Sequence, residues 1–245
     1  MNLFKLGVAV LLLATVTLTS CFTENNCKQG AGGIITRTIS IPSFTGIDFQ
    51  EAGEVIITQG ATQEIVAVGH ANVVDELSRE VYNGEWDIEL DHGCYDDYDL
   101  TIYITVPDLN EVHLSGAGHI TVNNFDNQEE DLDIAISGSG SISLSQFTGP
   151  ENMAVRISGS GTISANGNIP TMKSLDIKIS GSGNYWGFPI SADHCTISIP
   201  GSGNCQVVAN QTLDVKISGS GSVYYKGHPT VTSDISGSGS VVDAN

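Results

Sequence analysis

Basic side chains are scarce in this sequence. The chain of 245 residues carries nine Lys and Arg residues against 28 Asp and Glu residues, so its formal net charge at pH 7 is −19. Contacts to phosphate groups need clustered Lys and Arg, and a strongly acidic surface repels nucleic acid and anionic lipid headgroups. We therefore expect no nucleic-acid partner.

The motifs of nucleotide-binding and nucleophilic enzymes are also missing. Phosphate loops need a lysine after the glycines, or G-x-G-x-x-G between a strand and a helix. Neither occurs in the G-x-G copies of this chain, where no His recurs beside the serines and Ala117 replaces Ser in the first copy. A nucleophilic serine would need a base and an oxyanion site at one particular copy. The sequence thus predicts no cofactor and no catalytic residue.

Clusters with metal-ligand spacing are lacking as well. His113 and His119 flank one glycine corner without an evident third ligand, which makes a zinc site improbable. The stretch Asp91–Asp99 is rich in carboxylates but has the spacing of no known metal-binding loop. We interpret it as a solvated turn between two strands and predict no metal site.

A long apolar run occurs only at the start of the chain. In MNLFKLGVAVLLLATVTLTSC, Lys5 precedes an apolar stretch too short to span a membrane as a mature helix, which is typical of an export signal. The sequence Leu18-Thr19-Ser20-Cys21 resembles a lipobox. We predict a lipoprotein signal peptide over residues 1–20 and lipid attachment at Cys21, which would tie the protein to a membrane. An ordinary secretory signal cut nearby is the alternative.

Helical periodicity is nearly absent after this leader. Residues 21–33 are polar and glycine-rich, and we expect a flexible tether there. Residues 34–110 contain strand-like runs bounded by Gly, Pro and Asp, and form the predicted strand-rich head of the fold. Only residues 72–81 could make a turn or two of helix.

Residues 111–245 contain a repeat. Seven copies of a four-residue motif, S-G-x-G or in one case P-G-x-G, begin at residues 115, 137, 158, 180, 200, 218 and 236, so the steps between them are 18 to 22 residues. Apolar residues alternate with polar ones on both sides of each copy, as in strands with one buried face. The position just before each copy is apolar in all seven: Leu114, Ile136, Ile157, Ile179, Ile199, Ile217 and Ile235.

Such a repeat predicts a β-solenoid, in which successive rungs stack about 4.8 Å apart and equivalent residues form columns. We expect the glycines to form its corners, both because a bend often needs positive φ and because neighbouring rungs crowd any Cβ. Ser233 and Asp243 interrupt the pattern in the last copy. That is expected of a terminal rung that meets water.

Two outward columns are candidate sites. In one, Trp186 and Tyr224 lie two rungs apart, with Asn184 and Asn204 in the adjacent column. Aromatic faces beside amides and hydroxyls can bind sugar rings or a surface protein, although Trp186 could instead fold over its corner to cover Phe188. The other column holds the aspartates that a carbohydrate-active enzyme would need: Asp133, Asp176 and Asp214. A plainer account is that Arg156, Lys178 and Lys216, on the same face, offset these charges.

Four cysteines follow Cys21. Cys195 and Cys205 are both expected to point inward, with a corner and too great a distance between them for a bridge, so they should be buried thiols. Cys27 and Cys94 are the better candidate pair, and would join the tether to the first strands.

Three segments, residues 41–47 (IPSFTGI), 53–60 (GEVIITQG) and 106–118 (VPDLNEVHLSGAG), resemble the family described as "putative auto-transporter adhesin, head GIN domain". The resemblance extends over residues 36–243. It implies an all-β, right-handed parallel β-helix, similar in shape to pectin lyases but without their catalytic residues. It further implies an exported lipoprotein with a role in adhesion. We expect that lipoprotein in the outer membrane, with which Phe22 directly after Cys21 is compatible.

We therefore expect a non-enzymatic envelope protein that presents a rigid surface for adhesion, or for binding a glycan or a surface protein. The alternatives are a carbohydrate-active enzyme on the same β-helix and a purely structural envelope protein.

Overall fold

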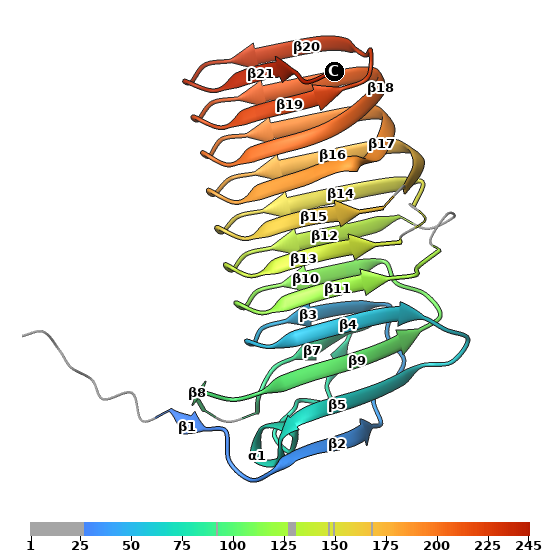
Figure 1. Ribbon diagram of the computed structural model, residues 1–245, viewed down its shortest axis with the longest axis vertical. Coiled ribbons are helices and arrows are strands. Elements are labelled where there is room, and N and C mark those ends of the chain that lie inside the picture. The colour runs from blue at the N-terminus through green and yellow to red at the C-terminus, as the bar shows by residue number, and fades with distance from the viewer. Residues whose placement is uncertain (1–26, 92, 127–130, 147, 149, 168) are drawn as a thin grey trace, which may run out of the picture.

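The computed structural model describes residues 27–91, 93–126, 131–146, 148, 150–167 and 169–245 (Figure 1). Its strands stack into a tall β-solenoid, with the C-terminal rung at one end and β2, β5 and α1 at the other. The head contains β1 (Lys28–Gln29), β2 (Ile34–Ile39), β3 (Gly46–Phe49), β4 (Glu54–Gln59), β5 (Glu64–His70), α1 (Ala71–Val74), β6 (Val81–Tyr82), β7 (Glu85–Ile88), β8 (Tyr95–Asp96) and β9 (Leu100–Val106). The repeat contains β10 (Glu111–Leu114), β11 (His119–Asn123), β12 (Leu132–Ile136), β13 (Ser141–Ser145), β14 (Asn152–Ile157), β15 (Thr162–Asn166), β16 (Ile169–Ile179), β17 (Asn184–Ile199), β18 (Asn204–Ile217), β19 (Ser222–Lys226), β20 (Thr230–Ile235) and β21 (Ser240–Asp243).

The solenoid has two walls of parallel strands that meet at the glycine corners. The pre-corner wall runs through β7, β3, β10, β12, β14, β16, the second halves of β17 and β18, and β20. The post-corner wall runs through β9, β4, β11, β13, β15, the first halves of β17 and β18, β19 and β21. Copies of the repeat are in register, because Ile136 pairs with Ile157 and Ile157 with Ile179. The predicted β-solenoid is confirmed.

The core is a dry stripe between the two walls. The residue before each of the first six corners is at most 1% exposed, and the residues from Ile120 to Val223 at the matching position after the corner are 0% exposed. In the last copy Ile235 is 40% exposed and Ser233 is exposed. The terminal rung therefore meets water, as the broken pattern predicted.

Crowding, and not backbone conformation, requires the corner glycines. A Cβ built on Gly138 would overlap the carbonyl oxygen of Gly116 one rung below, and one on Gly203 would overlap that of Gly183. None of the G-x-G glycines in the described rungs has a φ in the left-handed region. The expectation of positive φ was therefore wrong for these positions. The bend is made with ordinary φ values, and the rung below leaves no space for a side chain.

The head closes the lower end of the solenoid with antiparallel strands. Strands β3 and β4 continue the two walls, but β5 pairs antiparallel with both β2 and β9. Trp86, Val73 and Val74 are almost completely buried there. Of the helix expected within residues 72–81 only α1 forms, because the chain then turns to pair with the strand beyond it: Ser78 N donates to Glu89 O at 2.9 Å.

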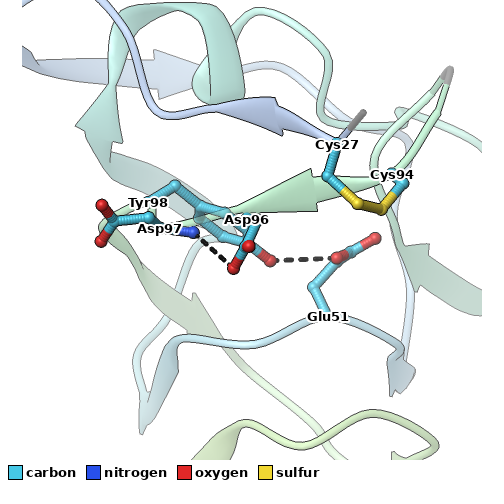
Figure 2. Close-up of a disulfide and its surroundings, with 6 residues drawn as sticks. All are labelled: Cys27, Glu51, Cys94, Asp96, Asp97 and Tyr98. Atoms are coloured by element: carbon cyan, nitrogen blue, oxygen red, sulfur yellow. Dashed lines mark hydrogen bonds between the residues drawn. A yellow bond between two sulfur atoms is a disulfide. The ribbon is translucent and has the colours of Figure 1, made fainter. Parts of the chain in front are cut away.

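A disulfide attaches the N-terminal segment to this head. Cys27 and Cys94 are bonded, with Cα atoms 4.6 Å apart (Figure 2), and β1 pairs parallel with β8 next to the bond. The side chain of Asn72 holds the following turn, since Ala31 N donates to its Oδ1 at 2.7 Å. Residues 27–33 of the expected tether thus lie against the head. Residues 1–26, which include the expected signal and Cys21, lie outside the described residues.

Candidate ligand-binding face

The post-corner wall presents an outward surface without carboxylates from β11 to the last rung. Its two main columns are the amide column, of His119, Ser141, Thr162, Asn184, Asn204, Ser222 and Ser240, and the aromatic column, of Thr121, Ser143, Ser164, Trp186, Gln206, Tyr224 and Val242. None of these fourteen residues is Asp or Glu, although the whole chain has 28. The surface is made of hydroxyl, amide and aromatic groups on flat, hydrogen-bonded strands.

Trp186 and Tyr224 lie where the sequence placed them. Trp186 pairs with Gln206 on the next rung and Gln206 with Tyr224 on the one after, so the backbone positions of the two aromatic residues are about 9.6 Å apart along the solenoid, at two strand spacings. Both are half-buried. A half-buried ring on a fixed strand gives an apolar contact area at little cost in conformational entropy.

Phe188 and Lys226, at the next outward position, extend this aromatic surface. Lys226 Nζ lies 4.5 Å from the centroid of the Phe188 ring, in the range of a cation–π contact. The repeat spacing that aligns Trp186 with Tyr224 could also have revealed this pair, because both residues stand eight positions after the first residue of their copies, at 180 and 218. The pair places a cation next to the aromatic column of an otherwise acidic protein.

The amides of Asn184 and Asn204 mainly hold the rungs together. Asn184 Oδ1 accepts hydrogen bonds from both the backbone N and Nδ2 of Asn204, each at 3.1 Å. Asn204 Oδ1 in turn accepts from the backbone N of Ser222 at 3.2 Å. Both side chains lie beside the aromatic column, as expected, but their oxygens already serve this ladder. For a ligand, these side chains would therefore provide a rigid contact surface more than free hydrogen-bond acceptors.

The pre-corner wall is charged instead. Its aspartate column is Glu111, Asp133, Ala154, Asp176, Thr196, Asp214 and Thr232. Asp133 and Asp176 both line an open groove of about 690 Å³, with Glu111, Asp131 and Glu151 around it. Arg156 donates to both carboxylate oxygens of Asp133, so this cation does offset the stacked charge. Asp214 does not line the groove.

Other candidate polar groups are engaged locally. His113 Nδ1 lies 2.9 Å from Glu85 Oε1. The pKa of Glu85 is raised, because burial outweighs the opposite effect of the neighbouring His113. His119 contacts Ser141 Oγ at 2.6 Å. Within the part of the chain that the structure describes, no group of three or more His, Cys, Asp or Glu residues is placed to hold a metal ion.

The cysteines of the repeat are core residues. Cys195 and Cys205 are free and buried, as expected, and burial raises the pKa of Cys195 to about 12. Their neighbour Tyr185 is completely buried. Among the helices of the described residues, none is long and apolar enough to cross a membrane.

Residues 43–229 match the family model described as "Putative auto-transporter adhesin, head GIN domain". The chain belongs to this family. The head GIN match begins after β2 and ends before β20, so it covers most of the head and every rung except the last.

Solved structures share the head GIN fold. A "putative adhesin" from Bacteroides fragilis superposes with a TM-score of 0.78 at 24% identity, covering 87% of this chain and 98% of that one. A "putative lipid binding protein" from Parabacteroides distasonis gives 0.72 at 24% identity, with 89% and 99% covered. A "putative adhesin" from Parabacteroides merdae gives 0.66 at 20% identity, with 89% and 98% covered. No curated protein matches the sequence.

Proposed function

We propose that this head GIN protein is a lipid-anchored, non-enzymatic protein of the outer membrane that binds carbohydrate through the carboxylate-free post-corner wall. The observation that carries the proposal is the composition of that wall: aromatic and amide columns without an acidic residue, on a chain of net charge −19. Sugars present hydroxyl groups and apolar ring faces, which suit such a surface. A surface protein is the other ligand class that it would suit.

The disulfide supports a defined orientation on the membrane. The expected lipid-bearing residue, Cys21, precedes the Cys27–Cys94 bond by only six residues. Six extended residues reach about 20 Å. The head would therefore stay near the membrane and the C-terminal rungs would project away from it, with Trp186 and Tyr224 on the distal part. The names of the structural relatives, adhesin and lipid-binding protein, agree with a role at a cell surface.

A glycan-array experiment tests the binding face. The wild type should bind a restricted set of glycans, and Trp186→Ala with Tyr224→Ala should weaken binding at least tenfold, because a buried aromatic anchor contributes more than 1 kcal/mol. The control is Tyr82→Ala, since this tyrosine is 73% exposed and lies on β6 of the head, which pairs with β7 and is not part of the post-corner wall. Equal binding by the double variant and this control would refute the proposed face.

The anchor is tested separately. Metabolic labelling with a fatty-acid analogue should modify the wild type and not Cys21→Ala, and only the wild type should fractionate with the outer membrane. Protease treatment of intact cells then distinguishes an exterior from a periplasmic location.

The acidic groove favours one second candidate, a carbohydrate-active enzyme that uses Asp133 and Asp176. Polysaccharide cleavage that is lost in Asp176→Asn but kept in Asp214→Asn, whose carboxylate lies outside the groove, would establish it. If the protein neither binds glycans nor cleaves polysaccharide, a purely structural envelope protein is the remaining alternative.

A further inference from the structure

The two ends of the solenoid differ. At the head end, β2, β5 and α1 cover the core. At the other end, β20 pairs with β18 and β21 with β19, and within the described residues neither strand has a partner on its outer side. One row of backbone donors and acceptors on each wall is therefore open (Figure 1).

The open rung also exposes the continuation of the core. Val231 and Ile235 are 38% and 40% exposed, whereas Leu213 and Ile217, which lie directly below them, are 0% exposed. Natural edge strands are usually protected by Lys, Pro, a bulge or an inward-pointing charge. Strand β20 contains no Lys or Pro, and its inward positions hold Val231, Ser233 and Ile235. In β21 the inward position opposite Tyr225 holds Asp243, so β20 is the unprotected strand of this rung.

The sequence of β20, TVTSDI, is complementary to itself about Ser233. In an antiparallel pair with Ser233 opposite Ser233 of a second copy, Val231 faces Ile235 on the core side. Thr232 then faces Asp234 on the outer side. Apolar residues meet apolar residues, and the two Asp234 carboxylates are not opposite each other, which cross-strand pairing requires.

Electrostatic repulsion between two acidic chains is weak at this end. Residues 212–245 contain three Asp and two Lys residues, a net charge of −1 out of −19 for the chain. Two copies that meet through the acidic groove of the pre-corner wall would oppose far more negative charge. A two-fold axis through Ser233, perpendicular to the pre-corner wall, would pair β20 with β20 of the second copy and close this open edge.

We propose that the C-terminal rung is a docking surface for a second copy of this chain, with the two solenoids joined end to end by antiparallel pairing of β20 about Ser233. The contact involves a single rung from each copy, which places it among small, transient interfaces. We expect a dissociation constant on the order of micromolar. If the chains are lipid-anchored at the head, which rests on the function proposed above, the pair would carry its two anchors at opposite ends.

Sedimentation equilibrium between about 1 and 100 µM tests the pairing. The wild type should shift from monomer to dimer, whereas Val231→Lys should remain monomeric because it introduces a charge into the interface core. Ile34→Lys is the matched control: Ile34 is an aliphatic strand residue with 54% exposure on β2, at the opposite end of the solenoid, so this variant should dimerise like the wild type. Circular dichroism confirms that both variants fold.

Cross-linking tests the register. Ser233→Cys should form an intermolecular disulfide on mild oxidation, since directly opposite residues have Cβ atoms about 5 Å apart. Thr232→Cys, the adjacent residue, should not, because in this register its equivalents are offset by two positions. A monomeric wild type throughout the concentration range, or equal cross-linking of both variants, would overturn the proposal.

The anchored arrangement has its own assay. Vesicles that carry the chain through an N-terminal lipid should cluster, and vesicles that carry Val231→Lys should stay dispersed. Dimerisation in solution without clustering would reject the opposed anchors while leaving the end-to-end pair intact.

Discussion

Single residues in this protein are constrained mostly by the rung below them. The G-x-G glycines show this most clearly, because the obstacle to a side chain is a carbonyl oxygen of the neighbouring corner and not the backbone torsion. A backbone oxygen inside a parallel ladder cannot move aside as the end of a flexible side chain can. The interior of the stack therefore tolerates no added methyl group at these positions.

Gly203→Ala should lower the free energy of unfolding by about 1–3 kcal/mol, the usual cost of overpacking. Urea denaturation measures it. Gly33→Ala is the control, because a Cβ there has no atom within 4 Å, and it should stay within about 0.5 kcal/mol of the wild type. Equal stability of the two variants would contradict the crowding argument.

Tyr98 makes the stability sensitive to alkaline pH. Burial, followed by the charge of Glu51 and a hydrogen bond to it, raises the pKa of Tyr98 to about 12, and its hydroxyl donates to Glu51 Oε2 at 3.0 Å (Figure 2). The folded state thus holds the proton more tightly than the unfolded state, where the pKa is about 10. The contribution of Tyr98 to the unfolding free energy is therefore fully present below pH 10 and is lost as the pH rises toward 12.

Tyr98→Phe should therefore reduce the fall in unfolding free energy between pH 10 and 12, while costing about 1 kcal/mol at pH 7 for the lost hydrogen bond. Guanidinium titrations at several pH values measure both effects. An unchanged alkaline slope would show that other buried groups, such as Cys195, dominate it.

At the scale of elements, strands that are equivalent in the repeat differ in what they connect. Strands β17 and β18 run through both walls, whereas each of the other strands of the repeat belongs to one wall. Among the described residues, the short strands β1 and β8 pair only with each other. They depend on the Cys27–Cys94 disulfide beside them.

Loss of that disulfide should destabilise the chain. The bond joins residues 67 positions apart, and closing a loop of that length is worth up to about 4 kcal/mol in the chain-entropy model. We expect Cys27→Ser with Cys94→Ser to lower the unfolding free energy by up to that amount, and to open residues 28–33 to proteolysis first. Reduced wild type should behave like the double variant, and a wild-type melting curve for that variant would disprove the expectation.

At the scale of the whole molecule, each rung contacts only its neighbours. Stability in such a stack is roughly a sum of nearest-neighbour contributions, and here one end is capped by the head while the other is open. Opening should therefore begin at the C-terminal rung.

Amide hydrogen exchange should show this gradient. Amides of β20 and β21 should exchange faster than those of β14 and β15, measured well below micromolar concentration so that end-to-end pairing does not protect them. Uniform protection along the stack would indicate a single cooperative unit.

The sequence alone determined the solenoid, its inward columns and the outward position of Trp186, Tyr224 and the aspartates. It did so because the repeat period near twenty residues and the alternation of apolar and polar residues can both be read from short stretches of sequence. When the rungs stack, residues with the same spacing from their corner come to lie in the same column. The sequence could not predict that the side-chain oxygens of Asn184 and Asn204 accept hydrogen bonds from the next rung, since this depends on side-chain geometry between rungs.

Only the tertiary structure decided the features that join unlike positions. The short α1 arises from competition with strand pairing, and the antiparallel cap from segments outside the repeat. The contrast between a closed head and an open last rung has the same origin. A repeat specifies how one rung sits on the next, whereas what covers the two ends depends on residues that the repeat does not contain.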